Sequence, residues 1–303
     1  MQPIVFFSDI FGFILNTIYN LVQNYGIAII LFSILIKIVM LPISIKQQTT
    51  RRKTAKLQGR VKELQKKYKG DPQKMNSEIM SLYRSEKMSP FSGCLGAIVQ
   101  MVLIFAMFIL VRNPLTHMRG IDSYELERME NHIRYTAGDE YIDNRYAEIS
   151  IIRYVRSRGV TYIGESEFYI NMDFAGLDLS DVPSSDWSNW TVYVIPALFV
   201  LSSAVSIRLT MSMNEKNTKG KNEEKKEIVL DKDGNPEPEE PDMMASMNKS
   251  MMWMMPIMSL TIAFIAPLGL ALYWLLNNIL MITEISILNK FVFSKEEAKV
   301  EGE

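Results

Sequence analysis

The chain has 303 residues, with 33 basic and 34 acidic side chains, two histidines and one cysteine. Apolar residues make up 48% of it, but they gather in blocks with hardly a charge, at residues 93–111, 192–207 and 251–276. A soluble globular protein spreads its charges more evenly, so this segregation indicates a chain that crosses a bilayer several times. One cysteine excludes a disulfide framework, and Cys94, His117 and His132 cannot form a zinc cluster. We expect no cofactor, no metal and no nucleic-acid substrate.

Residues 1–24 predict a helix that lies in the membrane surface. Ser8 and Asp9 can cap it, and polar residues recur along one side, namely Asp9, Asn16, Asn20 and Gln23. Apolar residues point to the other side, namely Ile10, Phe13, Ile14, Ile18 and Leu21. The alternative is that this helix extends the first membrane span.

Five membrane spans follow, which predicts an all-α polytopic membrane protein. About 20 residues of helix reach the ~30 Å needed for the hydrocarbon layer. The expected spans are residues 25–45, 91–111, 190–209, 251–267 and 268–290. The last two are separated at Pro267 and Gly269, where two short helices can fold back on each other.

The charges between the spans predict the orientation. Residues 46–90 carry 13 basic and 4 acidic side chains, which places this loop in the cytoplasm and the amino terminus outside. Residues 112–189 are expected to form the extracytoplasmic segment. Residues 113–190 carry 7 arginines, no lysine and 14 acids, and this excess of acidic side chains favours the outer side of the membrane. Short strands and short helices are both possible in it. Residues 210–250 are expected to form a largely disordered cytoplasmic loop, and residues 291–303 a cytoplasmic tail.

The basic loop at residues 46–90 predicts two antiparallel helices. One apolar stripe consists of Leu57, Val61, Leu64 and Tyr68, and the second of Met75, Ile79, Leu82 and Tyr83. Gly70-Asp71-Pro72 breaks the helix between the two stripes. The outer faces are strongly basic. They form either a solvated hairpin without a partner or a docking surface for ribosomal RNA, targeting factors or anionic lipid.

Lys37 is the residue that most needs an explanation, because a charge near the bilayer centre costs ~2.5 to 3.5 kcal/mol. It lies nine residues before Lys46, about 13 Å of helix from the cytoplasmic edge. Ser33, Lys37 and Ser44 share one face, which indicates the wall of a hydrated groove. The alternative is a structural lysine paired with a neighbouring carbonyl group.

Other polar residues within the spans can line the same groove or join helices by hydrogen bonds, namely Gln100, Asn277, Asn278 and Glu284. We expect Glu284 to stay apart from Lys37, because an ion pair would weaken the attraction of the groove for an acidic guest. The spacing of Ser33 and Lys37 also permits a nucleophilic pair. Backbone donors in a helix are already committed, so no oxyanion hole forms and no enzymatic activity is expected.

Several motifs resemble the YidC/Oxa-type membrane protein insertases. The first span and hairpin are similar through Ile34-Leu-Ile-Lys37-Ile-Val-Met-Leu-Pro42-Ile-Ser-Ile-Lys46-Gln47-Gln, Lys56-Leu-Gln58, Glu63-Leu-Gln-Lys-Lys-Tyr68-Lys-Gly-Asp71 and Leu82-Tyr83. The second span is similar through Pro90-Phe-Ser-Gly93-Cys94-Leu and Gln100-Met, and the last through Pro267-Leu-Gly269-Leu-Ala-Leu-Tyr273-Trp274-Leu-Leu-Asn277. The resemblance covers about two-thirds of the chain. The residue at Lys37 is usually arginine in this family.

The resemblance implies an insertase and chaperone of the bacterial plasma membrane, whose positively charged groove opens to the cytoplasm and to lipid. The expected groove residues are Lys37, Ser33, Gln100, Asn277, Tyr273 and Trp274. Nascent membrane proteins are the expected clients. The ribosome, targeting factors and the Sec translocon are possible partners of the hairpin. The alternative function is a transporter of small solutes or ions that uses the same intramembrane polar residues.

Overall fold

The computed structural model describes residues 3–68, 70–88, 95–158, 165–185, 188–219, 258 and 260–290, and most of these are helical. The chain separates into two compact units, which are described separately. The first unit comprises Met1–Val39, Gln100–Ser203 and Met258–Glu303, and the second comprises Met40–Val99 and Ala204–Ile257.

Four helices in the described part are long and apolar enough to cross a membrane, over Ile4–Val22, Tyr25–Ala55, Trp190–Ser212 and Leu268–Leu288. They correspond to α1 (Pro3–Val22), α2 (Tyr25–Lys67), α7 (Val194–Lys219) with the short turn η6 (Trp190–Tyr193) before it, and α9 (Leu268–Leu288). The helix α4 (Leu95–Arg112) contains a shorter apolar stretch, Ile98–Arg112. Most of the expected span 251–267, most of the loop 210–250 and the tail 291–303 lie outside the described residues.

The helix α2 differs from the expectation of a separate span and hairpin arm. It runs without interruption for 43 residues, with Pro42 inside it. The first arm of the expected hairpin is therefore a direct continuation of the first span. Gly70-Asp71-Pro72 ends the helix as predicted, because Asp71 caps the next helix, α3 (Pro72–Ser85), by accepting a hydrogen bond from the Lys74 backbone N–H.

The apolar stripes of α2 and α3 pack against each other within the second unit. Leu57, Val61 and Leu82 are buried in one cluster, flanked by Leu64, Ile79, Tyr83 and Met88. Arg60 and Glu86 add an exposed ion pair with an N–O distance of 2.8 Å. The cluster contains residues of both predicted stripes, but neither Tyr68 nor Met75 belongs to it.

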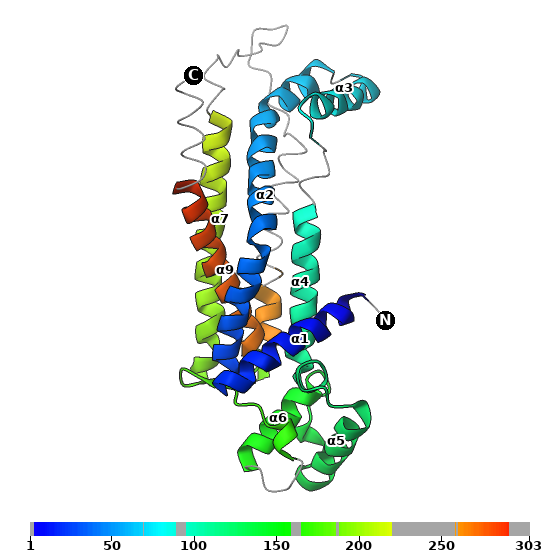
Figure 1. Ribbon diagram of the computed structural model, residues 1–303, viewed down its shortest axis with the longest axis vertical. Coiled ribbons are helices and arrows are strands. Elements are labelled where there is room, and N and C mark those ends of the chain that lie inside the picture. The colour runs from blue at the N-terminus through cyan, green and yellow to red at the C-terminus, as the bar shows by residue number, and fades with distance from the viewer. Residues whose placement is uncertain are drawn as a thin grey trace. The chain divides into compact units, whose positions relative to one another are not determined.

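The helix α1 has two dissimilar sides, and it runs obliquely across the direction of α4 and α9 (Figure 1). Phe11, Leu15 and Tyr19 are buried, whereas Phe6, Phe13 and Leu21 are exposed. Gly12 permits a close approach to the turn η2 (Leu115–Arg119), because a Cβ at Gly12 would lie 1.9 Å from the His117 carbonyl oxygen. The polar residues of α1 face this turn, and Asp9 contacts His117 at 2.6 Å.

The α4–α7 segment, residues 113–193, is mainly helical. Its elements after η2 are α5 (Ser123–Ala137), η3 (Asp139–Tyr141), α6 (Ala147–Arg158), η4 (Glu165–Phe168), β1 (Asp173–Phe174), β2 (Leu177–Asp178), η5 (Pro183–Ser185) and η6. The strands β1 and β2 pair antiparallel, with Asp173 opposite Asp178. Short helices and short strands, both expected as possible in this segment, are both present, and α6 buries residues on nearly all sides.

Hydrogen bonds attach the α4–α7 segment to the ends of the apolar helices. The first backbone N–H groups of α9, at Leu268 and Gly269, donate to the carbonyls of Asp181 and Leu179. The buried carboxylate of Glu148 accepts hydrogen bonds from the backbone N–H groups of Leu115 and Thr116 at the start of η2. These donors at helix starts therefore find partners within the chain instead of remaining unpaired.

Candidate functional site

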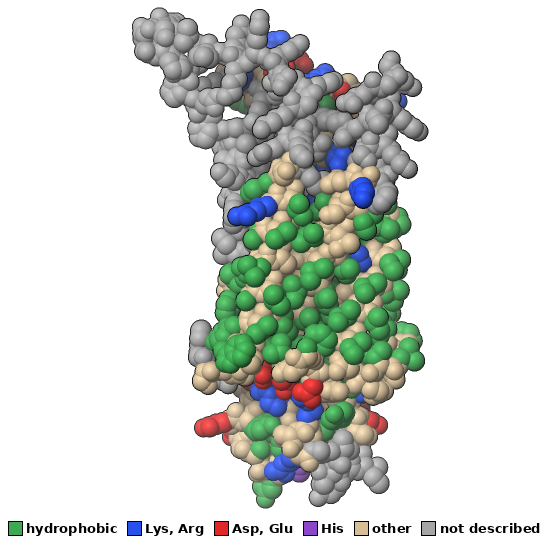
Figure 2. All heavy atoms as spheres, turned by 90° about the vertical axis from the view of Figure 1, so that its left-hand side faces the viewer, with side chains coloured by type: hydrophobic (Ala, Val, Ile, Leu, Met, Phe, Trp, Pro, Cys, Tyr) green, Lys and Arg blue, Asp and Glu red, His purple; other side chains and the backbone are tan. Residues whose placement is uncertain are grey.

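The polar residues predicted to form the site lie on α2, α4 and α9, within a core of apolar side chains. Around them, Ile29 and Phe32 of α2, Met107 and Leu110 of α4, and Leu272 of α9 belong to the same buried cluster. Figure 2 shows apolar side chains gathered on the face that it presents, with acidic and basic side chains below them. The polar residues of α2 and α9 are therefore placed within apolar helices.

Lys37 forms an ion pair with Glu284 of α9. The distance from Lys37 Nζ to the Glu284 carboxylate is 2.6 Å, and the exposed fractions of the two side chains are 21% and 5%. The expectation that these residues stay apart was therefore wrong. Pairing offsets part of the cost of removing each charge from water, and this cost is high for both residues within apolar helices.

The ion pair leaves Lys37 with hydrogen-bonding capacity. An ammonium group has three N–H donors, and the contact with Glu284 uses only one carboxylate oxygen. The side chain of Lys37 is also more exposed than that of Glu284. An acidic group can thus approach the lysine from its exposed side while the glutamate stays in place.

Ser33 lies one helical turn before Lys37 on the same face of α2. It is buried, and its hydroxyl donates a hydrogen bond to the Ile29 carbonyl oxygen at 2.7 Å. The hydroxyl proton of Ser33 is thus held by the helix backbone.

Asn278 joins α9 to α7. Its amide donates to Ser203 Oγ at 2.7 Å and to Ser202 Oγ at 3.3 Å. Of the two roles considered for Asn278, the structure shows the hydrogen bond between helices. Neither serine was predicted as a site residue, although Ser and Thr inside an apolar span commonly form hydrogen bonds to neighbouring helices.

The remaining predicted residues differ in their burial. Tyr273 and Trp274 are both buried, and the Trp274 ring packs on Phe199 of α7 with centroids 5.7 Å apart. Gln100 and Asn277 are half-buried. Among the predicted residues, the structure therefore brings Lys37 and Glu284 into direct contact, whereas Tyr273 and Trp274 contribute to packing.

The described part of the chain contains no group of three His, Cys, Asp or Glu side chains that could hold a metal ion. The chemistry that Lys37 and Glu284 offer is electrostatic: a partly exposed cation next to a buried carboxylate, each on an apolar helix.

Comparison with known proteins identifies the family. Residues 17–296 match the 60Kd inner membrane protein family. A membrane protein insertase YidC from Treponema denticola is 25% identical over 278 residues, which cover 92% of this chain and 36% of the relative. The protein of the same name from Ralstonia nicotianae is 25% identical over 285 residues, covering 94% of this chain and 36% of the relative.

A higher identity occurs over a shorter stretch. The membrane protein insertase YidC from Caldanaerobacter subterraneus is 42% identical over 101 residues, which cover 33% of this chain and 49% of that relative. The chain thus matches between about a third and a half of the length of these relatives. Because the family match extends over most of the chain, this multi-pass membrane protein belongs to the 60Kd inner membrane protein family, the YidC/Oxa-type family that its motifs resemble.

Proposed function

We propose that the chain is a membrane protein insertase and chaperone. In this proposal, a short polar part of a client enters a hydrophilic groove beside Lys37, and the apolar client helix then moves sideways into lipid. The observation that carries the proposal is the Lys37–Glu284 ion pair inside apolar helices of a YidC-type chain. Such a pair is costly in a membrane protein, and intramembrane charges of this kind mark functional sites.

The proposed topology has five spans, with the amino terminus outside and the carboxyl terminus in the cytoplasm. The long apolar helices α2, α7 and α9 support the polytopic part of this proposal. The helix α1 is assigned to the membrane surface instead of crossing it, although it is long enough to span. Its oblique course and its exposed Phe6, Phe13 and Leu21 support this placement (Figure 1), since a surface helix buries one apolar side in lipid.

The Lys37–Glu284 pair changes how the groove acts on a client. A pair of opposite charges is neutral as a whole, so the groove attracts an acidic client over a shorter range than a lone lysine would. The exposed side of Lys37 is proposed to bind a client carboxylate at close range, and Glu284 to keep the ammonium group in position before the client arrives. Gln100 and Asn277 are proposed to provide further hydrogen bonds, because both are half-buried polar side chains within the same apolar helices.

The apolar client helix is proposed to leave along α7 and α9. Leu198 and Leu201 of α7 are exposed, as are Ile279 and Ile287 of α9. Transfer of a client helix from the groove to lipid buries apolar surface, which stabilises the inserted state by about 25 cal/mol per Å². This free energy drives insertion, so the proposal requires neither a nucleotide nor a redox cofactor.

The helix pair formed by α2 and α3 is proposed to lie in the cytoplasm and to receive clients from the ribosome, from targeting factors or from the Sec translocon. The many basic side chains in residues 46–90 support this role, because positive charge attracts RNA, acidic proteins and anionic lipid headgroups.

Reconstitution tests the proposal directly. The purified full chain is placed in liposomes and supplied with a radiolabelled client that has one span and an acidic outer tail. We expect the tail to become protected from external protease only in liposomes that contain the chain. Solute flux without a client, together with no protection of the tail, would instead support a transporter.

A further inference from the structure

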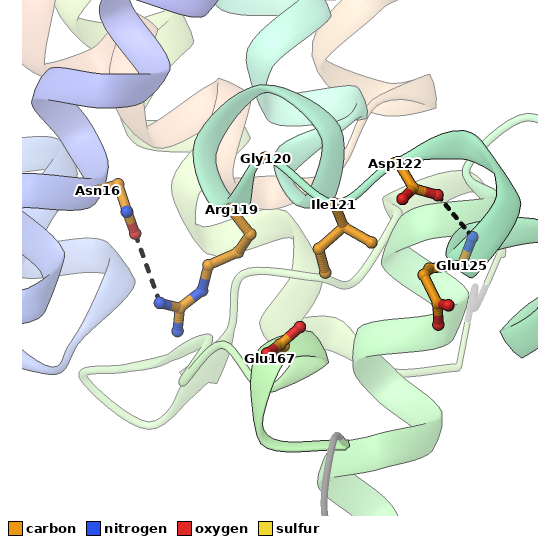
Figure 3. Close-up of a pocket in the computed structure, with 7 residues that line it drawn as sticks. All are labelled: Asn16, Arg119, Gly120, Ile121, Asp122, Glu125 and Glu167. Atoms are coloured by element: carbon orange, nitrogen blue, oxygen red, sulfur yellow. Dashed lines mark hydrogen bonds between the residues drawn. The ribbon is translucent and has the colours of Figure 1, made fainter.

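A polar cavity lies on the side of α1 that faces the α4–α7 segment. Its volume is about 400 Å³, and it is lined by Asn16, Arg119, Gly120, Ile121, Asp122, Glu125 and Glu167 (Figure 3). All of these residues belong to the first compact unit. Cavities that bind small ligands have volumes of roughly 300 to 1,000 Å³, so this one suits a group of modest size.

Arg119 forms the basic wall of the cavity, and its hydrogen bonding is incomplete. One terminal nitrogen donates to the Tyr169 carbonyl at 2.9 Å, while the other reaches Asn16 and Asn20 only at 3.4 Å. Its Nε is buried and has no hydrogen-bond partner in the described part of the chain. The two long contacts leave the terminal nitrogen weakly bonded, so an anion beside this guanidinium would be stabilising.

The surroundings of Arg119 hold it in place. The guanidinium carbon lies 4.9 Å from the centroid of the Tyr19 ring of α1, a cation–π contact. Burial lowers the pKa of Arg119, and Tyr19 partly opposes this effect. The charge of the side chain is therefore poorly solvated, although it is fixed in position.

Carboxylates form the other side of the cavity, and two of them already have partners within the chain. Asp122 accepts a hydrogen bond from the Glu125 backbone N–H at the start of α5, and Glu125 pairs with Arg128 at 2.6 Å. Glu167 of η4 is exposed, and the structure gives it no ion pair with another described residue. Figure 3 shows Glu167 between Arg119 and Glu125.

The charges in the cavity do not suit a metal ion or a simple anion. The described residues contain no group of three acidic or other ligating side chains close enough to bind a metal. A simple anion would be attracted by Arg119 but repelled by the three carboxylates. A ligand with a negative and a positive end satisfies both sides of the cavity.

We infer that this cavity binds the zwitterionic headgroup of an aminophospholipid, with the phosphate on Arg119 and the ammonium group on Glu167. The occupant is assigned to lipid because the cavity adjoins α1, whose exposed Phe13 and Leu21 are proposed to lie in the membrane surface. This inference thus rests on the proposed membrane placement of α1, but not on the insertase activity itself. A lipid held there would fix α1 against the α4–α7 segment.

Native mass spectrometry of the full chain tests the inference. The chain is mixed with phosphatidylethanolamine, phosphatidylcholine or phosphatidylglycerol of equal acyl chains. We expect phosphatidylethanolamine to bind best, because choline has no N–H donor and glycerol has no positive charge. Equal binding of phosphatidylglycerol would contradict the inference, since it would leave no role for the carboxylates.

Two matched variants locate the site. Glu167→Gln should weaken phosphatidylethanolamine binding about tenfold, the loss expected for one charge-assisted hydrogen bond. Glu127→Gln removes the same charge at an exposed position of α5 outside the cavity, and it should bind like the wild type. Equal affinities of the two variants would overturn the assignment to this cavity. Equal binding of free phosphoethanolamine would overturn the choice of lipid as its source.

Client insertion by the same proteins separates this inference from the proposed function. Both variants should insert the client at the wild-type rate, because neither position lies near Lys37 in the described helices. A wild-type chain that binds phosphatidylethanolamine selectively but inserts no client would refute the proposed function and leave the lipid site standing. A wild-type chain that inserts clients but binds the three lipids equally would refute the lipid site and leave the proposed function standing.

Discussion

The contact between Lys37 and Glu284 explains how one lysine is tolerated within an apolar helix. The carboxylate is almost fully buried, whereas the lysine keeps some exposure. In such a pair, removal of one partner is more harmful than removal of both, because a single buried charge is left without compensation.

This asymmetry predicts the stability of variants at the pair. Lys37→Ala should destabilise the protein by about 3 to 5 kcal/mol, because the buried Glu284 carboxylate loses the charge of the ammonium group that offsets its own. The double variant Lys37→Ala with Glu284→Ala should recover much of the loss, since no buried charge remains. Thermal unfolding in detergent measures both effects. A double variant that is less stable than Lys37→Ala would show that the pair is not the source of the cost.

Some residues of the site could be predicted from the sequence, and others could not. Lys37 was identifiable because a charge in an apolar span is costly, and Asn278 because amides join helices. The partner of Lys37 was missed, since Glu284 lies only six residues before Lys290 and resembles a residue at the membrane edge. Which side chain of α9 faces α2 depends on helix rotation, and the sequence of α9 alone does not determine that.

Among the elements, α1 depends most on a single close contact. Gly12 lies against the backbone of His117, and a Cβ there would be 1.9 Å from the carbonyl oxygen. Gly12→Ala should therefore push α1 away from η2 and lower the unfolding temperature. Thr17→Ala changes an exposed position of the same helix and should leave the unfolding temperature almost unchanged. Equal unfolding temperatures for the two variants would contradict the packing described for α1.

The hairpin β1–β2 depends on ionised carboxylates. Arg156 bridges Asp173 and Asp178, at 2.6 and 2.7 Å. Burial alone would raise the pKa of Asp178, but hydrogen bonds from Ser180 and the charge of Arg156 outweigh it, so the pKa falls below its usual 3.8. A lowered pKa in the folded state stabilises the fold above the unfolded value, and the stabilisation is lost as the pH falls through the folded value.

Acidification should therefore loosen this hairpin selectively. Opening of the β1–β2 hairpin, measured by hydrogen exchange, should change little from neutral pH to the usual aspartate range, and it should increase as the pH falls further through the lowered pKa of Asp178. Asp178→Asn removes the titrating group, so its opening should depend less on pH while being greater at neutral pH. The same pH dependence in Asp178→Asn and in the wild type would exclude Asp178 as the cause.

At this scale the sequence predicted the helices α1, α2, α3, α4, α7 and α9 more successfully than the α4–α7 segment. The apolar blocks and the two stripes of residues 46–90 each have a helical period that is visible without neighbours. In α6, which packs against α5 and η4, residues are buried on nearly all sides, so no period distinguishes helix from strand. The composition likewise did not predict that α2 continues as one helix through Pro42.

For the whole molecule, the positive charge of residues 46–90 predicts which compartment each part faces. With Cys94→Ala as background, Tyr135→Cys on α5 should react with a membrane-impermeant maleimide added outside the cell. Ser77→Cys on α3 should react only after the membrane is opened. Both positions are exposed in the structure, so access to the compartment alone decides the result. Outside labelling of Ser77→Cys would reverse the proposed orientation.

The central claim is that Lys37 attracts the acidic part of a client, and that Glu284 only positions it. The most direct measurement compares insertion of one client with an acidic tail by Lys37→Gln, Lys37→Arg and Glu284→Gln in liposomes, at equal amounts of folded protein. The account predicts that Lys37→Gln loses most of its insertion, whereas Lys37→Arg and Glu284→Gln retain it, because both keep the positive charge. Equal loss in Lys37→Gln and Glu284→Gln, or full insertion by Lys37→Gln, would contradict the account.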